Sequence, residues 1–303
     1  MAELITLGES GVATPEQCRS GMSGPGFDPE ESGSLENAAQ WLARLGNNRD
    51  FLGDILVDAL AGTGAGTSDA LAGLGGNAVM ICPPGEGNFF VVAQIWPGIE
   101  DHAYRVSGPA PFDYDRAHDH TFDFLQLGYF GPGLEMETWT YEAAQVEGHV
   151  GERVAITPAE NLVLEPGMMV RYRAGRDIHR VQPPRSLAVT LALAHNHAVH
   201  GWLEHYQFEI ADGSSAIIAA RHGGGPSEAF LRIAVGLGGE EALDLAERFA
   251  RHHPSDRMRL AAWRALVAQA PDDAARDALW AQAERGGSQL VARHAQAMRR
   301  SGR

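Results

Sequence analysis

Cysteine, basic runs and long apolar segments are all scarce in this sequence. Its two cysteines, Cys18 and Cys82, lie far apart and form no CxxC or zinc-knuckle pattern. This argues against a disulfide framework and fits a reducing compartment. The N-terminus lacks the basic, apolar and small-residue order of a secretory signal, and no apolar run reaches the roughly 18 residues that a transmembrane helix needs. We therefore expect a cytoplasmic protein with no membrane partner.

Positive charge is also scarce. The 24 Lys and Arg residues face 39 Asp and Glu residues, which gives a formal net charge of -15. Nucleic-acid binding relies on a basic stripe that neutralises phosphates, and the first 250 residues contain no basic run. The basic residues near the C-terminus stand among Ala and Gln, as on an exposed helix end. We expect no nucleic-acid partner. The 44% of hydrophobic residues is ordinary for a globular protein with a core.

Residues 1–76 are expected to form an N-terminal helical segment and a Gly-rich linker. A Gly/Pro/Ser-rich stretch precedes a helical pattern over residues 34–60, for which Ser34 is the expected N-cap. The linker, residues 61–76, contains GTGAGT. This motif follows a helix and lacks GK[ST], so we do not interpret it as a phosphate-binding loop.

The rest of the chain changes from strands to helices. Residues 77–222 consist of short segments rich in β-branched and aromatic residues, separated by Gly, Pro, Asn or Asp. This pattern, without intervening helices, indicates an antiparallel sandwich or barrel. Residues 226–303 are amphipathic, with P-[SD]-D breaks between helices. They fit either HEAT-type helical pairs or a three- to four-helix cap on the barrel, and could contact a protein partner or a second copy.

The segment AHDHTFDFLQLGYFGPG, residues 117–133, carries the most chemical information. Residues two apart in a strand share a face, so His118 and His120 should project together. His179 follows a Pro166-Gly167 turn and could supply a third ligand. Imidazoles suit Fe, Zn, Mn, Ni or Cu, and three protein ligands leave positions open. The alternative is a pair of hydrogen-bonded histidines on a strand.

These motifs resemble those of the cupin superfamily, whose RmlC-like jelly roll is a single antiparallel β-barrel. The HxH pair, Gly128 and Gly131, the Pro-Gly turn and His179 match, whereas Phe124 stands where the usual motif has Glu. Lacking this carboxylate, the chain is similar over residues 77–195 to the three-histidine thiol dioxygenase (cysteine dioxygenase-like) branch. The resemblance implies a ferrous site at His118, His120 and His179, where O2 and a small-molecule substrate meet.

One feature of that branch is absent. Thiol dioxygenases usually carry an Arg on an early barrel strand to hold the substrate carboxylate, and the segment NAVMICPP has none. The residues that could serve instead are Arg105, Arg116, Arg171 and Arg173.

Three further residues are predicted to act at the site. Asp123 lies opposite the histidines by strand alternation, but alignment on the FLQL run places it where the branch carries a residue close to the metal. Tyr129 and Tyr141 are expected to line the cavity as proton donors, with core packing as the alternative. Asp119 should point away from the ion and orient a histidine ring.

Other candidates are left open. Glu135 and Glu137 share one face of a strand and could either supply a carboxylate ligand or be solvated at its edge. His195, His197 and His200 could hold a second ion, although no matching partner group is evident.

The leading interpretation is a mononuclear non-haem iron oxidoreductase, a dioxygenase that acts on a small polar substrate. A non-redox metal-dependent cupin isomerase or lyase is the first alternative. The second is a non-enzymatic cupin binding or scaffold protein.

Overall fold

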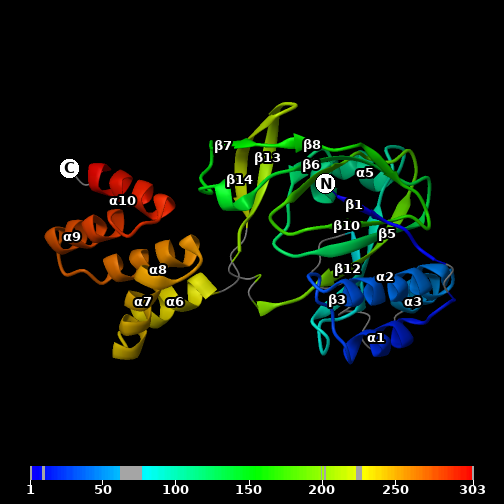
Figure 1. The fold of residues 1–303 in the computed structure, drawn as a ribbon, viewed down its shortest axis with the longest axis horizontal. Coiled ribbons are helices and arrows are strands. Elements are labelled where there is room, and N and C mark those ends of the chain that lie inside the picture. Colours follow the sequence, from blue (N-terminus) through cyan, green and yellow to red (C-terminus); the bar gives the residue numbers. More distant parts are fainter. Residues whose placement is uncertain are drawn as a thin grey trace. The chain divides into compact units, whose positions relative to one another are not determined.

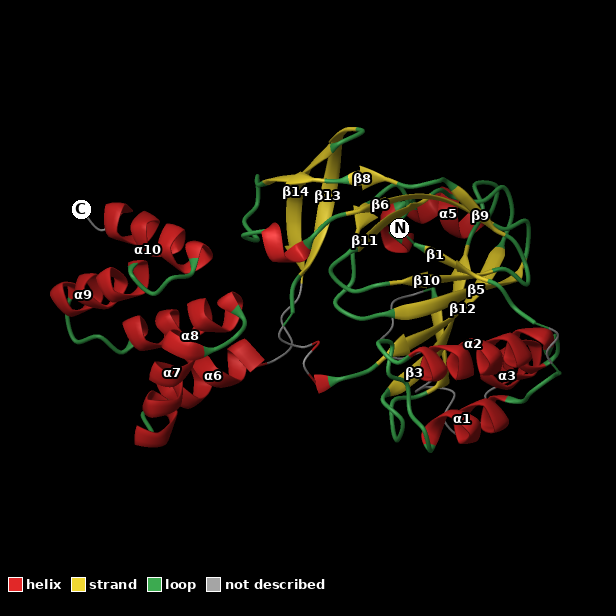
Figure 2. Cartoon of the chain, in the orientation of Figure 1, coloured by secondary structure: helices red, strands yellow, loops and turns green. Residues whose placement is uncertain are grey.

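The computed structural model describes residues 2–8, 11–61, 77–198, 200, 203–222 and 227–301 (Figures 1 and 2). The expected Gly-rich linker after residue 61 and the expected boundary at Gly223–Pro226 lie outside these ranges. The helices are α1 (Pro15–Ser23), α2 (Ser32–Asn47), α3 (Phe51–Ala61), α5 (His102–Ser107), α6 (Ser227–Gly236), α7 (Glu240–His252), α8 (Asp256–Ala268), α9 (Asp273–Glu284) and α10 (Gln289–Ser301), with 3-10 turns η1 (Ala110–Phe112) and η2 (Ala143–Gln145).

The strands form two antiparallel sheets. They are β1 (Glu3–Ile5), β2 (Ala78–Cys82), β3 (Phe89–Trp96), β4 (Ala117–His118), β5 (Phe124–Phe130), β6 (Leu134–Thr140), β7 (Arg153–Ala155), β8 (Thr157–Pro158), β9 (Leu162–Leu164), β10 (Met169–Tyr172), β11 (Asp177–Val181), β12 (Ala188–His195), β13 (His205–Asp212) and β14 (Ser215–His222). One sheet has the order β1-β10-β5-β12-β3-β2. The other has the order β7-β14-β13-β4-β11-β6-β8, with β9 beside β6. The prediction of an antiparallel β-barrel followed by helices is confirmed.

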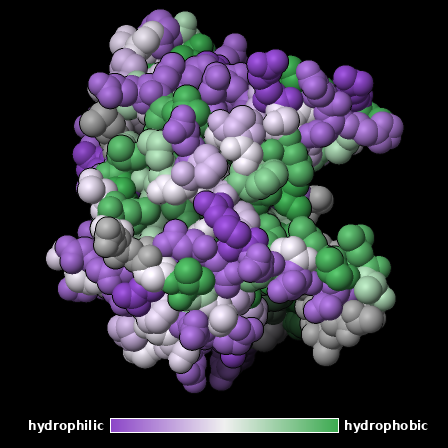
Figure 3. All heavy atoms as spheres, turned by 90° about the vertical axis from the view of Figure 1, so that its right-hand side faces the viewer, coloured by the Kyte–Doolittle hydropathy of each residue, from purple (hydrophilic) through white to green (hydrophobic). Residues whose placement is uncertain are grey.

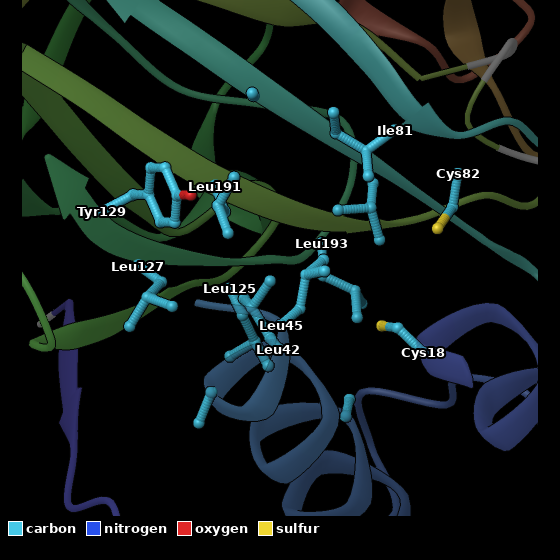
Figure 4. Packing of buried hydrophobic residues seen from close by; sticks show 14 of the residues in the cluster. Cys18, Leu42, Leu45, Ile81, Cys82, Leu125, Leu127, Tyr129, Leu191 and Leu193 are labelled. Carbon is cyan, nitrogen blue, oxygen red and sulfur yellow. The ribbon is translucent and has the colours of Figure 1, made fainter. Parts of the chain in front are cut away.

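The six-stranded sheet is buried on both faces. In β5, Leu125, Leu127 and Tyr129 pack into a cluster with Leu42 and Leu45 of α2 (Figure 4). The alternate residues of β5 point to the other face, as the twofold period of a strand requires. Burial on both faces explains why FLQLGYF and AVTLALAH are almost continuously apolar.

The N-terminal helices differ from the predicted pattern. The N-cap of α2 is Glu31, whose carboxylate accepts from the backbone N–H groups of Gly33 and Ser34. The prediction that Ser34 caps this helix is therefore wrong. The Ser34 hydroxyl instead donates to the Gly26 carbonyl. Helix α1, which the composition of its region obscured, begins with a capping box between Thr14 and Gln17.

The barrel region also contains helices that the sequence did not predict. Helix α5 and η1 interrupt the strands between β3 and β4. Both are shorter than two helical turns, too short to give a helical periodicity in the sequence.

The two cysteines lie in the outer cluster of the six-stranded sheet. Cys18 on α1 and Cys82 on β2 are buried free thiols (Figure 4). The cluster therefore joins the N-terminal helices to the barrel, and the expected N-terminal segment shares the core of the barrel.

The C-terminal helices have a core of their own. Its large members include Trp263 and Trp280, and every buried residue in it comes from residues 231–295. The two P-[SD]-D breaks each supply the N-cap of the helix that follows. Ser255 caps α8 by accepting from the Met258 backbone N–H, and Asp272 caps α9 by accepting from the Ala275 backbone N–H.

The chain forms two compact units. The first comprises Met1–Ala143, Val154–His197 and Gln207–Ala216, and the second comprises Ala144–Arg153, Ala198–Tyr206 and Ile217–Arg303. Within the second unit, Arg293 of α10 forms an ion pair with Glu147 at 2.8 Å. Residues 144–153 and 198–206 therefore belong to the same compact unit as the C-terminal helices. The predicted domains, residues 77–222 and 226–303, had placed both segments in the barrel.

We expect a chain truncated after His222 to fold and to bind metal. The buried clusters on the two faces of the six-stranded sheet contain no residue beyond Ala194, so removal of the helices should leave both intact. Circular dichroism and metal analysis of the truncated chain test this. An insoluble or metal-free product would show that the helices are required for the barrel.

Hydrophilic residues cover much of the face drawn in Figure 3, with hydrophobic residues between them. Among the described residues, no helix is both long and apolar enough to cross a membrane.

Candidate metal centre

Three histidines converge on the inner side of the second sheet. His118 on β4 and His179 on β11 are direct partners in the antiparallel pairing of these strands. His120 follows two residues after His118, beyond the end of β4. One nitrogen from each ring can be chosen so that all three lie within 4.8 Å of one another. The structure therefore brings together the three residues predicted as ligands, although the strand expected to carry His120 ends at His118.

The protonation states suit a divalent ion. The Nδ1 atom of His118 lies 3.0 Å from the Arg116 carbonyl oxygen, so it carries the hydrogen and leaves the Nε2 lone pair for a metal. Burial, followed by the neighbouring His118 and His120, lowers the pKa of His179 well below its ordinary value. Its Nδ1 is buried without a hydrogen-bond partner among the described residues. A neutral buried nitrogen of this kind is satisfied by a bound metal.

Asp119 lies between the two histidines of the HxH pair and is fully buried. Its carboxylate accepts a short hydrogen bond from the Tyr141 hydroxyl. The ring of Tyr141 packs edge-on against Phe208, with centroids 5.4 Å apart. Tyr141 is therefore hydrogen-bonded to the residue between His118 and His120. It does not line the adjoining cavity.

We expect Tyr141→Phe to weaken metal binding about 10-fold, the lower end of the effect of removing a group that supports a ligand. The change removes one donor from the buried Asp119 carboxylate and loosens the HxH segment. Titration of the apo protein with Co(II) measures it.

The matched control for this change is Tyr129→Phe. Its hydroxyl donates to the Asn48 carbonyl on the outer face of the six-stranded sheet, 2.9 Å away. The control should lose stability without losing metal affinity. Equal metal affinity in both variants would contradict a supporting role for Tyr141.

A cavity of about 370 Å³ adjoins the histidines, between the two sheets. Its lining residues are Asn77, Ala78, Phe90, Val92, Gln94, Trp96, Phe112, Asp113, His118, His120, Phe122, Phe124, Gln126, His179, Val181, Ala192 and Ala194. Apolar side chains, five of them Phe or Trp, make up most of this wall, and among the described residues no arginine belongs to it. Arg116, Arg171 and Arg173 instead pair with Asp113, Asp123 and Asp177.

One aromatic residue at the site was not predicted from the sequence. Tyr172 of β10 is fully buried, and its ring lies 4.6 Å from that of His179 and 4.8 Å from that of Phe124. The Tyr172 hydroxyl lies 3.0 Å from the sulfur of Met136. Tyr172 therefore packs against the rings of His179 and Phe124, two residues that line the cavity. The alternation of side chains along β10 could have placed Tyr172 on the inner face, but only once the pairing of β10 with β5 was known.

The structure places Asp123 and Tyr129 away from the cavity lining. The Asp123 carboxylate accepts from Arg171 at 3.2 Å and from the Ala174 backbone N–H at 3.0 Å. Tyr129 lies on the outer face of the sheet, against Phe51. Catalytic roles for Asp123, Tyr129 and Tyr141 stay predictions, and these placements favour structural roles for Asp123 and Tyr129.

The other acidic and histidine candidates do not join the metal group among the described residues. Glu137 pairs with Arg180 across the sheet, and Glu135 is exposed. His195 packs edge-on against Phe27 at 5.8 Å, and its ring lies 6.1 Å from that of His197. Burial lowers the pKa of His195. His200 is likewise outside the group.

No protein-family model matches the chain, and no curated protein matches it. Among solved structures, it is similar to the DMSP lyases RdDddP and RnDddQII at 14% identity and a TM-score of 0.24, covering 65% of this chain and 80% of that one. It is also similar to the DMSP lyase DddQ from Ruegeria pomeroyi DSS-3 at 12% identity and a TM-score of 0.25, covering 65% and 79%.

A third solved structure, Fe(II)-HppE with the alternative substrate (S)-1-HPP, shows 11% identity and a TM-score of 0.24, covering 59% of this chain and 88% of that one. At such TM-scores the assignment of the site rests on its own geometry: a two-sheet barrel with a three-histidine group that suits a divalent metal. The resemblance to the thiol dioxygenase branch stays a prediction.

Proposed function

We propose that the protein is a mononuclear non-haem iron oxidoreductase that acts with O2 on a small molecule held in the barrel cavity. The observation that carries this proposal is the group of His118, His120 and His179, which opens onto an aromatic-lined cavity of about 370 Å³. Three neutral nitrogens form a donor set suited to Fe(II), with Zn, Mn, Ni and Cu as competitors. When bound, Fe(II) supplies a redox-active centre with open coordination positions.

The chain's own residues prepare this site in two ways. Tyr172 and Phe124 stack with centroids 4.8 Å apart and hold the His179 ring in place. Phe90 and Phe122 form an edge-to-face pair at 6.1 Å in the cavity wall, and Ala192 and Ala194 leave room between the sheets. These apolar side chains lower the local polarity of the cavity, which strengthens electrostatic attraction inside it.

The ligand set also bears on the charge of the substrate. Three imidazoles contribute no negative charge, and no described arginine lines the cavity. Positive charge at the site would therefore come from the metal itself. An anionic or readily deprotonated substrate group is expected at the ion rather than at an arginine clamp.

Anaerobic purification with metal analysis tests the proposal first. We expect about one equivalent of iron per chain, followed by oxygen uptake when amino acids and thiols are screened as substrates. A protein that holds no metal after reconstitution with Fe(II) would contradict the proposal. It would favour the binding or scaffold alternative if the metal-free chain still captured a partner.

A further inference from the structure

A polar network interrupts the apolar inner face of the six-stranded sheet. Gln94 on β3, Gln126 on β5 and Thr190 on β12 lie on three adjacent strands, and Thr190 is the direct partner of Gln94. The Gln126 amide nitrogen lies 3.2 Å from both the Gln94 amide oxygen and the Thr190 hydroxyl. Gln126 is 4% exposed and Thr190 is 1% exposed, so the network is part of the interior.

Trp96 adds one hydrogen bond of fixed direction to this network. Its indole N–H can only donate, and it donates to the Thr190 hydroxyl oxygen at 3.0 Å. Thr190 also accepts from Gln126, and its own hydrogen is donated to the Gln94 oxygen at 3.4 Å. Each internal group is satisfied, and the two amides are held side by side.

One amide NH2 group and one amide oxygen take no part in these bonds. The Gln94 Nε2 group and the Gln126 Oε1 atom have no hydrogen-bond partner among the residues that the structure describes, and both side chains line the cavity. Exchanging N and O in both amides preserves the network and again leaves one NH2 group and one carbonyl. The cavity therefore presents a donor and an acceptor on two neighbouring side chains in either arrangement.

Away from the three histidines, the cavity offers little charge to a ligand. The chain contains no lysine, and the one carboxylate of the described lining, Asp113, is largely exposed and paired with Arg116. A donor and acceptor side by side in an apolar wall complement an uncharged group that carries the reverse pair. Leaving such amides unpaired in an apolar cavity is unfavourable, so a ligand that pairs with both gains affinity and orientation.

We infer that Gln94 and Gln126 form a subsite for an uncharged carboxamide group of the substrate, whose other end reaches the three histidines across the cavity. This inference rests on the proposed function, because it places the metal-binding end of the same molecule at His118, His120 and His179. Trp96 and Thr190 act as positioning residues, since they hold the two amides and leave their free groups facing the cavity.

The test uses the Co(II)-loaded full chain without oxygen and two thiols of equal size. One is 3-mercaptopropionamide, and the other is 3-methyl-1-butanethiol, in which an isopropyl group replaces the carboxamide. Thiolate-to-cobalt charge-transfer absorption gives the affinity of each. We expect Gln94→Met to lower the ratio of amide to apolar affinity about 10-fold, the effect of losing one or two neutral hydrogen bonds. Binding of the apolar thiol should be unchanged.

The matched control is Gln182→Met, because Gln182 bonds to Glu137 and does not line the cavity. Its affinity ratio should equal that of the unmodified chain. Gln126→Met is the second test variant and decides the matter if Gln94→Met does not bind cobalt. A 3-mercaptopropionate titration should show no comparable loss in either variant, which separates amide recognition from carboxylate recognition.

Two negative results have different meanings. An unchanged ratio in both Gln94→Met and Gln126→Met would overturn the amide subsite and leave the metal site standing. Failure of the unmodified chain to bind Co(II) would overturn the proposed function, and this inference with it.

Discussion

Replacement of His179 with alanine is expected to abolish stoichiometric metal binding while the barrel stays folded. The group has three nitrogen ligands, and no described carboxylate joins it, so two imidazoles would remain. The side chain lies between the rings of Tyr172 and His118, and its loss opens a small cavity. We expect a modest loss of stability, on the order of 1–3 kcal/mol. Metal analysis and thermal unfolding of the variant measure the two effects separately.

A suitable control is His195→Ala. His195 is also partly buried, but it packs against Phe27 and does not belong to the metal group. This variant should keep full metal occupancy. His118→Ala and His120→Ala should behave like His179→Ala. Full occupancy in all three ligand variants would show that the metal binds elsewhere.

Fe(II) and Zn(II) are expected to bind to the same three histidines and to differ completely in oxygen consumption. Zinc suits the same imidazole ligands but has no accessible second oxidation state. Once a substrate has been found by screening, the iron-loaded protein should consume oxygen in proportion to substrate, and the zinc-loaded protein should stay at background. An oxygen electrode with matched metal loadings measures this.

The His179→Ala variant, treated with the same iron, provides the control for adventitious metal. Its oxygen uptake should fall to background. Equal substrate turnover with zinc and iron would rule out the oxygenase proposal. It would favour the isomerase or lyase alternative, in which the ion acts as a Lewis acid.

Local patterns in the sequence determined the class of fold and the ligand residue types. Short segments rich in β-branched and aromatic residues, separated by turn residues, predicted antiparallel strands over residues 77–222, and these strands are present. Ser255 and Asp272 cap helices where the P-[SD]-D breaks indicated. Such features depend on residues within one turn or one strand, so they can be derived from neighbours in the chain.

Some local signals were nevertheless ambiguous. Ser34 and Glu31 both lie near the start of α2, and either could have been its N-cap. The Ser34 hydroxyl donates to the Gly26 carbonyl, and Glu31 caps the helix. Tyr129 was expected in the cavity. The sequence shows that Tyr129 shares a face of β5 with Leu125 and Leu127. Only the packing of α2 against that face shows that it is the outer face of the sheet.

The site itself depended on the pairing of distant strands. The sequence by itself determined that His118, His120 and His179 were candidate ligands, because imidazole chemistry and the HxH spacing are local properties. Only the tertiary structure decided that β4 pairs with β11 in the register that sets His118 opposite His179. It alone joined Gln94, Gln126 and Thr190, since register between strands is set by packing over long sequence separations and a slip of one residue would turn each side chain to the other face.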